Sequence, residues 1–192
     1  MISTADDGHF KIWDLRRAEG QKFTMTFKAA EDSLCVGSFN PINEHLFAVA
    51  GEESGNISVW DMRMPADAIN HFIHHSSQVT LLEWSPESEY ILASGSDDHK
   101  INIWDQSNAG AEQGRGDYDD GPPEMVFPHE FHGSNIEDLT WINTSACGTT
   151  SPAICSLETN YSMQIWKMSD DCCQRELDNY KYLDKIDLKE LE

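Results

Sequence analysis

The chain has 192 residues, of which 39% are hydrophobic and 10% aromatic, and this share of apolar residues predicts a packed globular core and excludes a disordered tail. Its 34 acidic residues against 13 basic ones give a formal net charge of −21, which repels nucleic-acid phosphates and anionic membranes and favours a basic protein as the partner. No apolar run reaches the roughly 20 residues of a membrane-spanning helix, and the first residues, MISTADDGHF, lack the pattern of a secretion signal, so we expect a soluble protein that is not secreted.

The dipeptide Trp-Asp recurs along the chain, beginning at Trp13, Trp60 and Trp104, with a degenerate fourth copy at Trp166-Lys167. The successive tryptophans are 47, 44 and 62 residues apart. Each one ends an alternating stretch, FKIWD, NISVWD, KINIWD or SMQIW, which is typical of a strand. A second pattern, FNPINEHLFAVAG and WSPESEYILASGS, starts a new apolar run after a proline turn. Four strands in about 40 to 45 residues are typical of WD40 blades, so the sequence predicts an all-β propeller.

In chain order, the pattern predicts part of a strand over 11–14, an outer strand over 22–28 and then three sets of inner strands. The expected starts of these inner strands are near Ser33, His45 and Asn56 in the first set, Gln78, Tyr90 and Lys100 in the second, and Asn135, Pro152 and Tyr161 in the third. Outer strands are expected near 68–74 and 124–130. This gives about three and a half blades of a presumed seven-bladed ring. Because a propeller closes with four to eight blades, we expect the chain to be a fragment or one part of a larger assembly.

Two segments depart from the repeat. The longer last spacing comes from the acidic Pro-Pro stretch DQSNAGAEQGRGDYDDGPPEMVF, which predicts a blade-interrupting loop at 106–124 within a partial propeller over 1–168. The tail over 169–192 changes to helical composition. An apolar stripe that includes Tyr180, Leu183 and Leu191 predicts a C-terminal helix there.

The cysteines and histidines indicate neither a disulfide framework nor a metal site. Five cysteines, Cys35, Cys147, Cys155, Cys172 and Cys173, include no CxxC pair and are interpreted as reduced thiols. Among eight histidines, His75 and His132 stand just before an innermost strand, where WD40 repeats commonly hold a histidine that bonds within its own blade.

The Ser, His and Asp residues of SGSDDHK fit the same repeat pattern, and the chain has no GxSxG or HExxH motif. We therefore expect no enzymatic activity, no cofactor and no metal.

The acidic loop is the feature most suggestive of a function. Its carboxylates surround Gly121-Pro122-Pro123 and precede the apolar run that contains Phe127; they belong to Asp117, Asp119, Asp120 and Glu124. One interpretation is a solvated connector whose Phe127 packs on its own blade. The other is a proline-stiffened loop that holds carboxylates beside an apolar anchor, which would suit a basic amphipathic helix because stiffness reduces the entropy lost on binding.

Four stretches together resemble the histone-binding WD40 proteins, the retinoblastoma-binding and MSI-type subunits of chromatin complexes: DYDDGPPEMVFPHEFHGSNIEDLTW, GSFNPINEHLFAVAG, WSPESEYILASGSDDHKINIWD and MQIWKM. The likeness covers nearly the whole chain and matches the C-terminal half of that family. It implies a non-catalytic scaffold of chromatin assembly or modifying complexes, located in the nucleus or also in the cytoplasm.

In that family, the propeller binds the first helix of histone H4 between this loop and an N-terminal helix. By resemblance, one wall of the groove is formed by Asp119, Asp120, Gly121, Pro122, Pro123, Glu124 and Phe127. The N-terminal helix has no counterpart in these 192 residues, and Pro128 stands where the family usually has an aliphatic residue.

The resemblance implies a second site at the top of the central channel, which takes a basic peptide such as the histone H3 tail. Glu158 and Asn160 match that site, whereas Gln78 and Thr80 replace an acidic and an aromatic residue, and Cys35 replaces a polar rim residue. Two alternatives to the histone role remain open. One is a ribosome-biogenesis WD-repeat chaperone for a basic ribosomal protein, and the other is a generic WD40 interaction scaffold.

Overall fold

The computed structural model describes residues 1–16, 23–29, 33–52, 54–64, 66–111, 121–142 and 153–168. Within these ranges the chain is built of β-strands and one short 3-10 helix, η1 (Gln106–Asn108). The strands are β1 (Ile2–Thr4), β2 (His9–Trp13), β3 (Phe23–Lys28), β4 (Leu34–Phe39), β5 (Leu46–Gly51), β6 (Ile57–Asp61), β7 (Asn70–Phe72), β8 (Val79–Trp84), β9 (Ile91–Ser96), β10 (Ile101–Asp105), β11 (Met125–His129), β12 (Ile136–Ile142), β13 (Ala153–Glu158) and β14 (Met163–Lys167).

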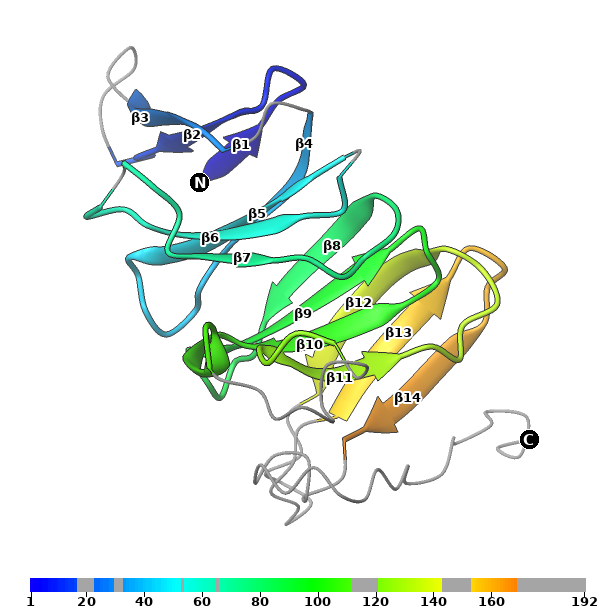
Figure 1. Ribbon diagram of the computed structural model, residues 1–192. Coiled ribbons are helices and arrows are strands. Elements are labelled where there is room, and N and C mark those ends of the chain that lie inside the picture. The colour runs from blue at the N-terminus through cyan, green and yellow to red at the C-terminus, as the bar shows by residue number, and fades with distance from the viewer. Residues whose placement is uncertain are drawn as a thin grey trace.

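The strands form four antiparallel sheets, each a simple meander, which stand side by side like the blades of a propeller (Figure 1). We number them blade 1 (β1–β3), blade 2 (β4–β7), blade 3 (β8–β11) and blade 4 (β12–β14). In the part of the chain that is described, blades 2 and 3 have four strands, while blades 1 and 4 have three. The prediction of an all-β partial propeller with about three and a half blades is therefore confirmed.

The inner strands of blades 2 to 4 begin within about two residues of their expected starts. For example, β4 begins at Leu34, β9 at Ile91 and β14 at Met163. Strand β1 was not expected, because its three residues contain neither a tryptophan nor a preceding proline turn. The helix expected over 169–192 and most of the acidic loop, 112–120, lie outside the described residues.

The core consists of three apolar layers, one between each pair of neighbouring blades. Every tryptophan that ends the third strand of a blade packs on the preceding blade. Trp60 joins Phe10 of blade 1, Trp104 stacks on Phe72 of blade 2 with ring centroids 5.0 Å apart, and Trp166 joins the layer facing blade 3. Strands β5 and β6 are buried along their whole length because a blade covers each of their faces.

Candidate functional site

A buried chain of hydrogen bonds ties blade 3 together. Trp104 Nε1 donates to Ser94 Oγ at 2.8 Å, and Ser94 Oγ lies 2.7 Å from His75 Nε2. On the other side of the ring, His75 Nδ1 donates to the Asp98 carboxylate at 2.9 Å. The serine, histidine and aspartate thus satisfy one another and the indole N–H inside the blade. This arrangement confirms that His75 bonds within its own blade.

Blade 4 repeats the same chain with a glutamate in place of the aspartate. Trp166 Nε1 donates to Ser156 Oγ at 3.2 Å, and Ser156 Oγ lies 3.0 Å from His132 Nε2. His132 Nδ1 donates to Glu158 Oε1 at 2.8 Å. The expectation for His132 is confirmed as well, and Glu158 acquires a structural role that its charge alone did not predict.

Glu158, one of the two residues matched to the channel-top site, is only 2% exposed. Its carboxylate also accepts hydrogen bonds from Gly133 N at 3.0 Å, Ser134 Oγ at 3.1 Å, Asn160 Nδ2 at 3.0 Å and Gln164 Nε2 at 3.1 Å. Asn160 therefore lies beside Glu158. Because blade 4 itself satisfies this carboxylate, its part in peptide binding stays a prediction.

The two buried carboxylates are held in the charged form. Burial alone would raise the pKa of Asp98, but hydrogen bonds from the His75 ring and from the backbone N–H groups of Ser76 and Lys100 outweigh it and lower that pKa to about 2. Burial likewise opposes the charge of Glu158, whose pKa is lowered to about 2 by bonds from its own blade, the first of them from His132. Both acids therefore stabilise the fold while they are ionised.

The polar groups of Gln78 and Thr80, which were also compared with the channel-top site, contact this chain itself, within blade 3 and across to its neighbours. Gln78 Nε2 donates to Cys35 Sγ at 2.8 Å, which links blade 3 to blade 2. Thr80 Oγ1 lies 3.5 Å from the carbonyl oxygens of Gly95 and Ile136. At these positions the structure therefore has amide, hydroxyl and thiol groups that contact one another or the backbone.

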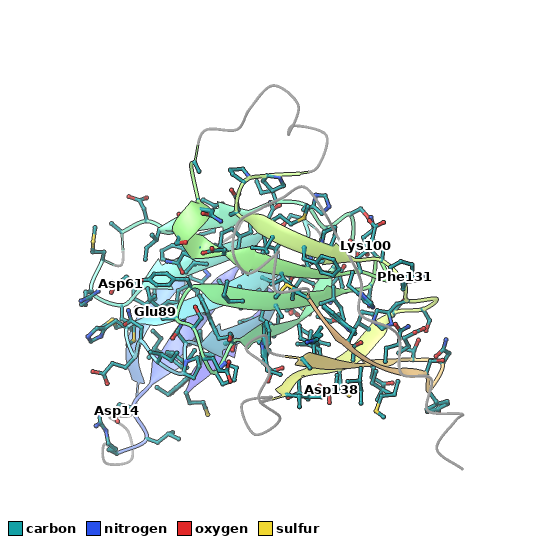
Figure 2. All side chains as sticks on the ribbon, turned by 90° about the horizontal axis from the view of Figure 1, so that it is seen from below. Asp14, Asp61, Glu89, Lys100, Phe131 and Asp138 are labelled. Carbon is teal, nitrogen blue, oxygen red and sulfur yellow. The ribbon has the colours of Figure 1, made fainter. Side chains whose placement is uncertain are left out.

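The two candidate sites lie at opposite ends of the blades. Figure 2 shows Lys100 and Phe131 at one end and Asp61 and Glu89 at the other. The Glu158 turn bonds to the backbone segment that follows Phe131, so the channel-top residues lie at the first end. The acidic loop leaves β10 after Asp105, which matches Asp61 in the strand pattern and so lies at the second end.

Both ends of the acidic loop are fixed to blade 3. At its start, Asp105 accepts hydrogen bonds from the backbone N–H and the hydroxyl of Ser107 and so caps η1. At its end, Met125 N donates to the Pro122 carbonyl at 2.9 Å, and Asp105 N donates to the Glu124 carbonyl at 2.7 Å. Residues 121–124 therefore form a tight, partly exposed turn against the start of β11.

Gly121 is required in this turn. Its φ of +108° lies in a region that only glycine enters readily, and a β-carbon there would also force the flexible Met125 methyl to move. Asp119 and Asp120, the other predicted members of the wall, precede it and lie outside the described residues.

Phe127 is placed in the core rather than on the surface. It is 4% exposed and belongs to the apolar layer between blades 3 and 4, where its ring centroid lies 5.8 Å from that of Trp166. Phe127 is therefore a packed core ring, as in the alternative interpretation, although it packs on blade 4 as well as on its own blade. The structure thus brings residues 121–124 together in a partly exposed turn and places Phe127 in the core between blades 3 and 4.

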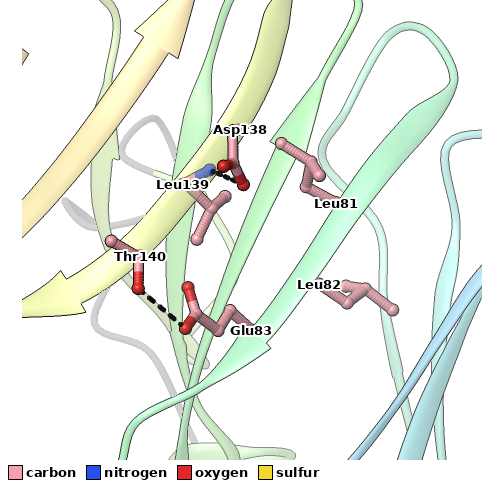
Figure 3. Close-up of a pocket in the computed structure, with 6 residues that line it drawn as sticks. All are labelled: Leu81, Leu82, Glu83, Asp138, Leu139 and Thr140. Carbon is pink, nitrogen blue, oxygen red and sulfur yellow. Dashed lines mark hydrogen bonds between the residues drawn. The ribbon is translucent and has the colours of Figure 1, made fainter. Parts of the chain in front are cut away.

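A hollow between β8 and β12 was not expected from the sequence. Leu81, Leu82, Glu83, Asp138, Leu139 and Thr140 line it (Figure 3). The Glu83 carboxylate accepts a hydrogen bond from Thr140 Oγ1 at 3.2 Å, and burial raises its pKa. The sequence shows Glu83 only as an acid in an alternating inner strand. A strand carboxylate that faces solvent would give the same pattern, so the hollow could not be predicted.

Within the described ranges, no group of three or more His, Cys, Asp or Glu side chains is arranged to bind a metal ion. No helix in these ranges is long and apolar enough to cross a membrane.

Residues 67–105, which cover β7 to β10, match the family model described as "WD domain, G-beta repeat". The structure is also similar to a chain in the "Crystal Structure of Mitotic Checkpoint Complex", with a TM-score of 0.67 and 16% identity, covering 96% of this chain and 48% of that one. Residues 67–105 therefore contain a WD40 repeat, and the chain is similar to WD40-repeat proteins. At 16% identity the solved structure shows the shared fold alone.

Two curated relatives share one name and match most of the chain. This WD40-repeat chain is 30% identical over 173 residues to "Histone acetyltransferase type B subunit 2" of Debaryomyces hansenii, covering 86% of the chain and 40% of the relative. It is 28% identical over 169 residues to the protein of the same name from Candida glabrata, covering 88% and 38%. The resemblance to histone-binding WD40 proteins is confirmed, and the chain spans about 40% of the length of these relatives.

The carboxylates of Asp98 and Glu158, each paired with a histidine, predict how stability depends on pH. An acid whose pKa is lowered on folding stabilises the fold above its unfolded pKa of about 4, and this contribution is lost as the pH falls toward its folded pKa. The free energy of unfolding should therefore drop between about pH 4 and pH 2. Asp98→Asn and Glu158→Gln should each flatten this drop in urea titrations, whereas the exposed Glu137→Gln should not. An unchanged slope in both variants would contradict the structural role of the two acids.

The core position of Phe127 predicts a loss of stability on truncation. Phe127→Ala should lower the free energy of unfolding by about 3 to 5 kcal/mol, because it removes a buried ring and leaves a cavity between blades 3 and 4. Phe131→Ala, at a ring that is 51% exposed, is the matched control and should cost clearly less. Urea titration compares the two, and equal losses would show that Phe127 is not a core residue.

Proposed function

We propose that this WD40 chain is part of a non-catalytic scaffold subunit that presents histone H4 to a chromatin-modifying complex in the nucleus. The observation that carries this proposal is the match over most of the chain to two proteins named histone acetyltransferase type B subunit 2. In the proposal, the chain contacts the first helix of H4 through the loop that ends in Gly121-Pro122-Pro123-Glu124, and other subunits of the complex bind elsewhere on the propeller.

The geometry of the loop supports this contact. Residues 121–124 are partly exposed, and their backbone is held by two hydrogen bonds and by consecutive prolines. A segment ordered in this way loses little entropy when a partner docks. Such a turn can therefore present one fixed wall to a helix without a large cost of reorganisation.

Charge supports a basic partner. The chain carries a formal net charge of −21, and the sequence before the turn, DYDD, adds carboxylates directly beside it. Exposed carboxylates act at long range on a cationic helix and mainly raise the rate of association. We therefore assign steering and orientation to Asp119, Asp120 and Glu124.

Phe127 has a different part in this proposal from the anchor first expected. Its ring lies in the apolar layer between blades 3 and 4 and holds β11, the strand that follows the turn. In the proposal, Phe127 stabilises the position of residues 121–124 from within the core, and the partly exposed residues of the turn contact the H4 helix.

Removing the steering charges tests the proposal. Asp119→Asn combined with Asp120→Asn should slow association of a peptide of the first H4 helix and flatten the dependence of its rate on salt. The reason is that fewer charges then contribute to the long-range field that salt screens. Glu44→Gln combined with Asp67→Asn removes two exposed carboxylates elsewhere and should leave both quantities nearly unchanged. Stopped-flow association at several salt concentrations measures this difference.

A pulldown from nuclear extract identifies the partner class. Enrichment of histones over ribosomal proteins is the expected result. Enrichment of ribosomal proteins would favour the ribosome-biogenesis chaperone, and capture of neither class would leave only the generic scaffold. An H4 peptide that associates at the same rate with both double variants would contradict the assignment of the loop.

A further inference from the structure

The hollow between blades 3 and 4 has an apolar wall. Leu81 and Leu82 of β8 and Leu139 of β12 line it, and its volume is about 360 Å³ (Figure 3). Leu81 and Leu139 both approach Gly95, where an added β-carbon would lie 3.3 Å and 3.1 Å from their methyl groups. Sites for small ligands span roughly 300 to 1,000 Å³. The hollow is therefore large enough for a short aliphatic chain, which would pack on these leucines.

The hollow also contains a carboxyl group that is incompletely bonded. Glu83 Oε1 accepts a hydrogen bond from Thr140 Oγ1 at 3.2 Å, whereas Glu83 Oε2 is buried and has no hydrogen-bond partner within the described residues. In Figure 3 this second oxygen points between the two strands, on the side of Leu139. A buried acceptor without a donor is unfavourable, so a donor brought into the hollow would stabilise this carboxyl group.

A second carboxylate indicates that the missing donor is a cation. Asp138 also lines the hollow, where it accepts a hydrogen bond from the backbone N–H of Leu139 at 2.9 Å. Burial raises the pKa of Glu83, and the nearby charge of Asp138 raises it further against the opposing bond from Thr140. The residues that line the hollow include no lysine, arginine or histidine. The two acids therefore repel each other, and a cation between them would relieve this repulsion.

The available acceptors match an ammonium group. An ammonium has three N–H donors on a compact centre. Glu83 Oε2, the Asp138 carboxylate and Thr140 Oγ1 offer three acceptors around the same hollow. A guanidinium has five donors, more than these groups match, and Ca²⁺ or Mg²⁺ takes about six or more oxygen ligands. The leucines in the wall likewise favour a cation that carries an aliphatic stem.

We propose that the hollow between β8 and β12 binds an alkylammonium group. Its aliphatic chain packs on Leu81 and Leu139, and its –NH₃⁺ group lies between Glu83 and Asp138. Two sources share this chemistry: the lysine side chain of a peptide and a free alkylamine. The site uses none of the residues assigned to the H4 loop or to the channel-top site, so it is independent of the proposed function.

Titration of the 192-residue chain with the diamine cadaverine, followed by NMR of methyl-labelled leucines, tests the proposal. The Leu81 and Leu139 methyl signals should shift and saturate. Glu83→Gln keeps the shape of the side chain but removes its charge, and it should weaken binding about tenfold or more because a charge-assisted hydrogen bond is lost. Asp138→Asn should weaken binding in the same direction. Glu137→Gln removes an exposed carboxylate of the same strand outside the hollow, so it is the matched control and should leave binding nearly unchanged.

Neutral and peptide probes complete the test. Pentanol has the apolar chain of pentylamine without its charge and should bind about tenfold more weakly or not at all. Tighter binding of a blocked Gly-Lys-Gly peptide than of cadaverine would assign the site to a lysine side chain, and the reverse order would assign it to a free amine. Urea titration confirms that each variant remains folded.

Three results would overturn the proposal. The first is a set of Leu81 and Leu139 methyl signals that respond to neither the diamine nor the peptide. The second is equal binding of pentanol and pentylamine, which would show an apolar hollow that does not select a cation. The third is equal affinity of Glu83→Gln, Asp138→Asn and Glu137→Gln for cadaverine, which would show that the net negative charge of the whole chain attracts the amine.

Discussion

The packing of an indole ring on the apolar face of the neighbouring blade is the contact on which the rest of this structure depends. A blade has two apolar faces and cannot bury either one alone. Burying the indole also buries its N–H group, which needs a partner in a region that excludes water. The serine, histidine and acid in blades 3 and 4 supply that partner and satisfy one another. The polar network exists because the apolar contact requires it.

This rigid stack determines where function can reside. The carboxylates of Asp98 and Glu158 accept hydrogen bonds from their own blades and therefore offer little to a partner. The segments that are free to bind are those that leave the stack, and the acidic loop after Asp105 is the longest connection between two described strands. Because both of its ends are fixed to blade 3, a long insertion can still present an ordered turn. The proposed contact with H4 relies on that turn.

The sequence predicted the strands well because spacing and alternation are local signals. It could not place Phe127, since an apolar residue after a polar loop is equally compatible with a surface anchor and with a core ring. Glu158 was matched to the channel-top site by resemblance alone, and its bond to His132 was not predicted. It lies eight residues before Trp166, whereas Asp98 lies six before Trp104, so the longer turn hides the shared role. Glu83 gave no distinct signal, because burial of an inner strand depends on the neighbouring blade.

Hydrogen–deuterium exchange on dilute chains tests most directly whether stacking between blades holds the structure together. Amides open most slowly where the surrounding structure is covered on both sides. The account predicts the slowest exchange in β5, β6, β9 and β10, and the fastest among the strands in β1 and β14, whose blades each pack on only one other blade within the described residues. Equal protection across all four blades, or slowest exchange in β1 and β14, would contradict it.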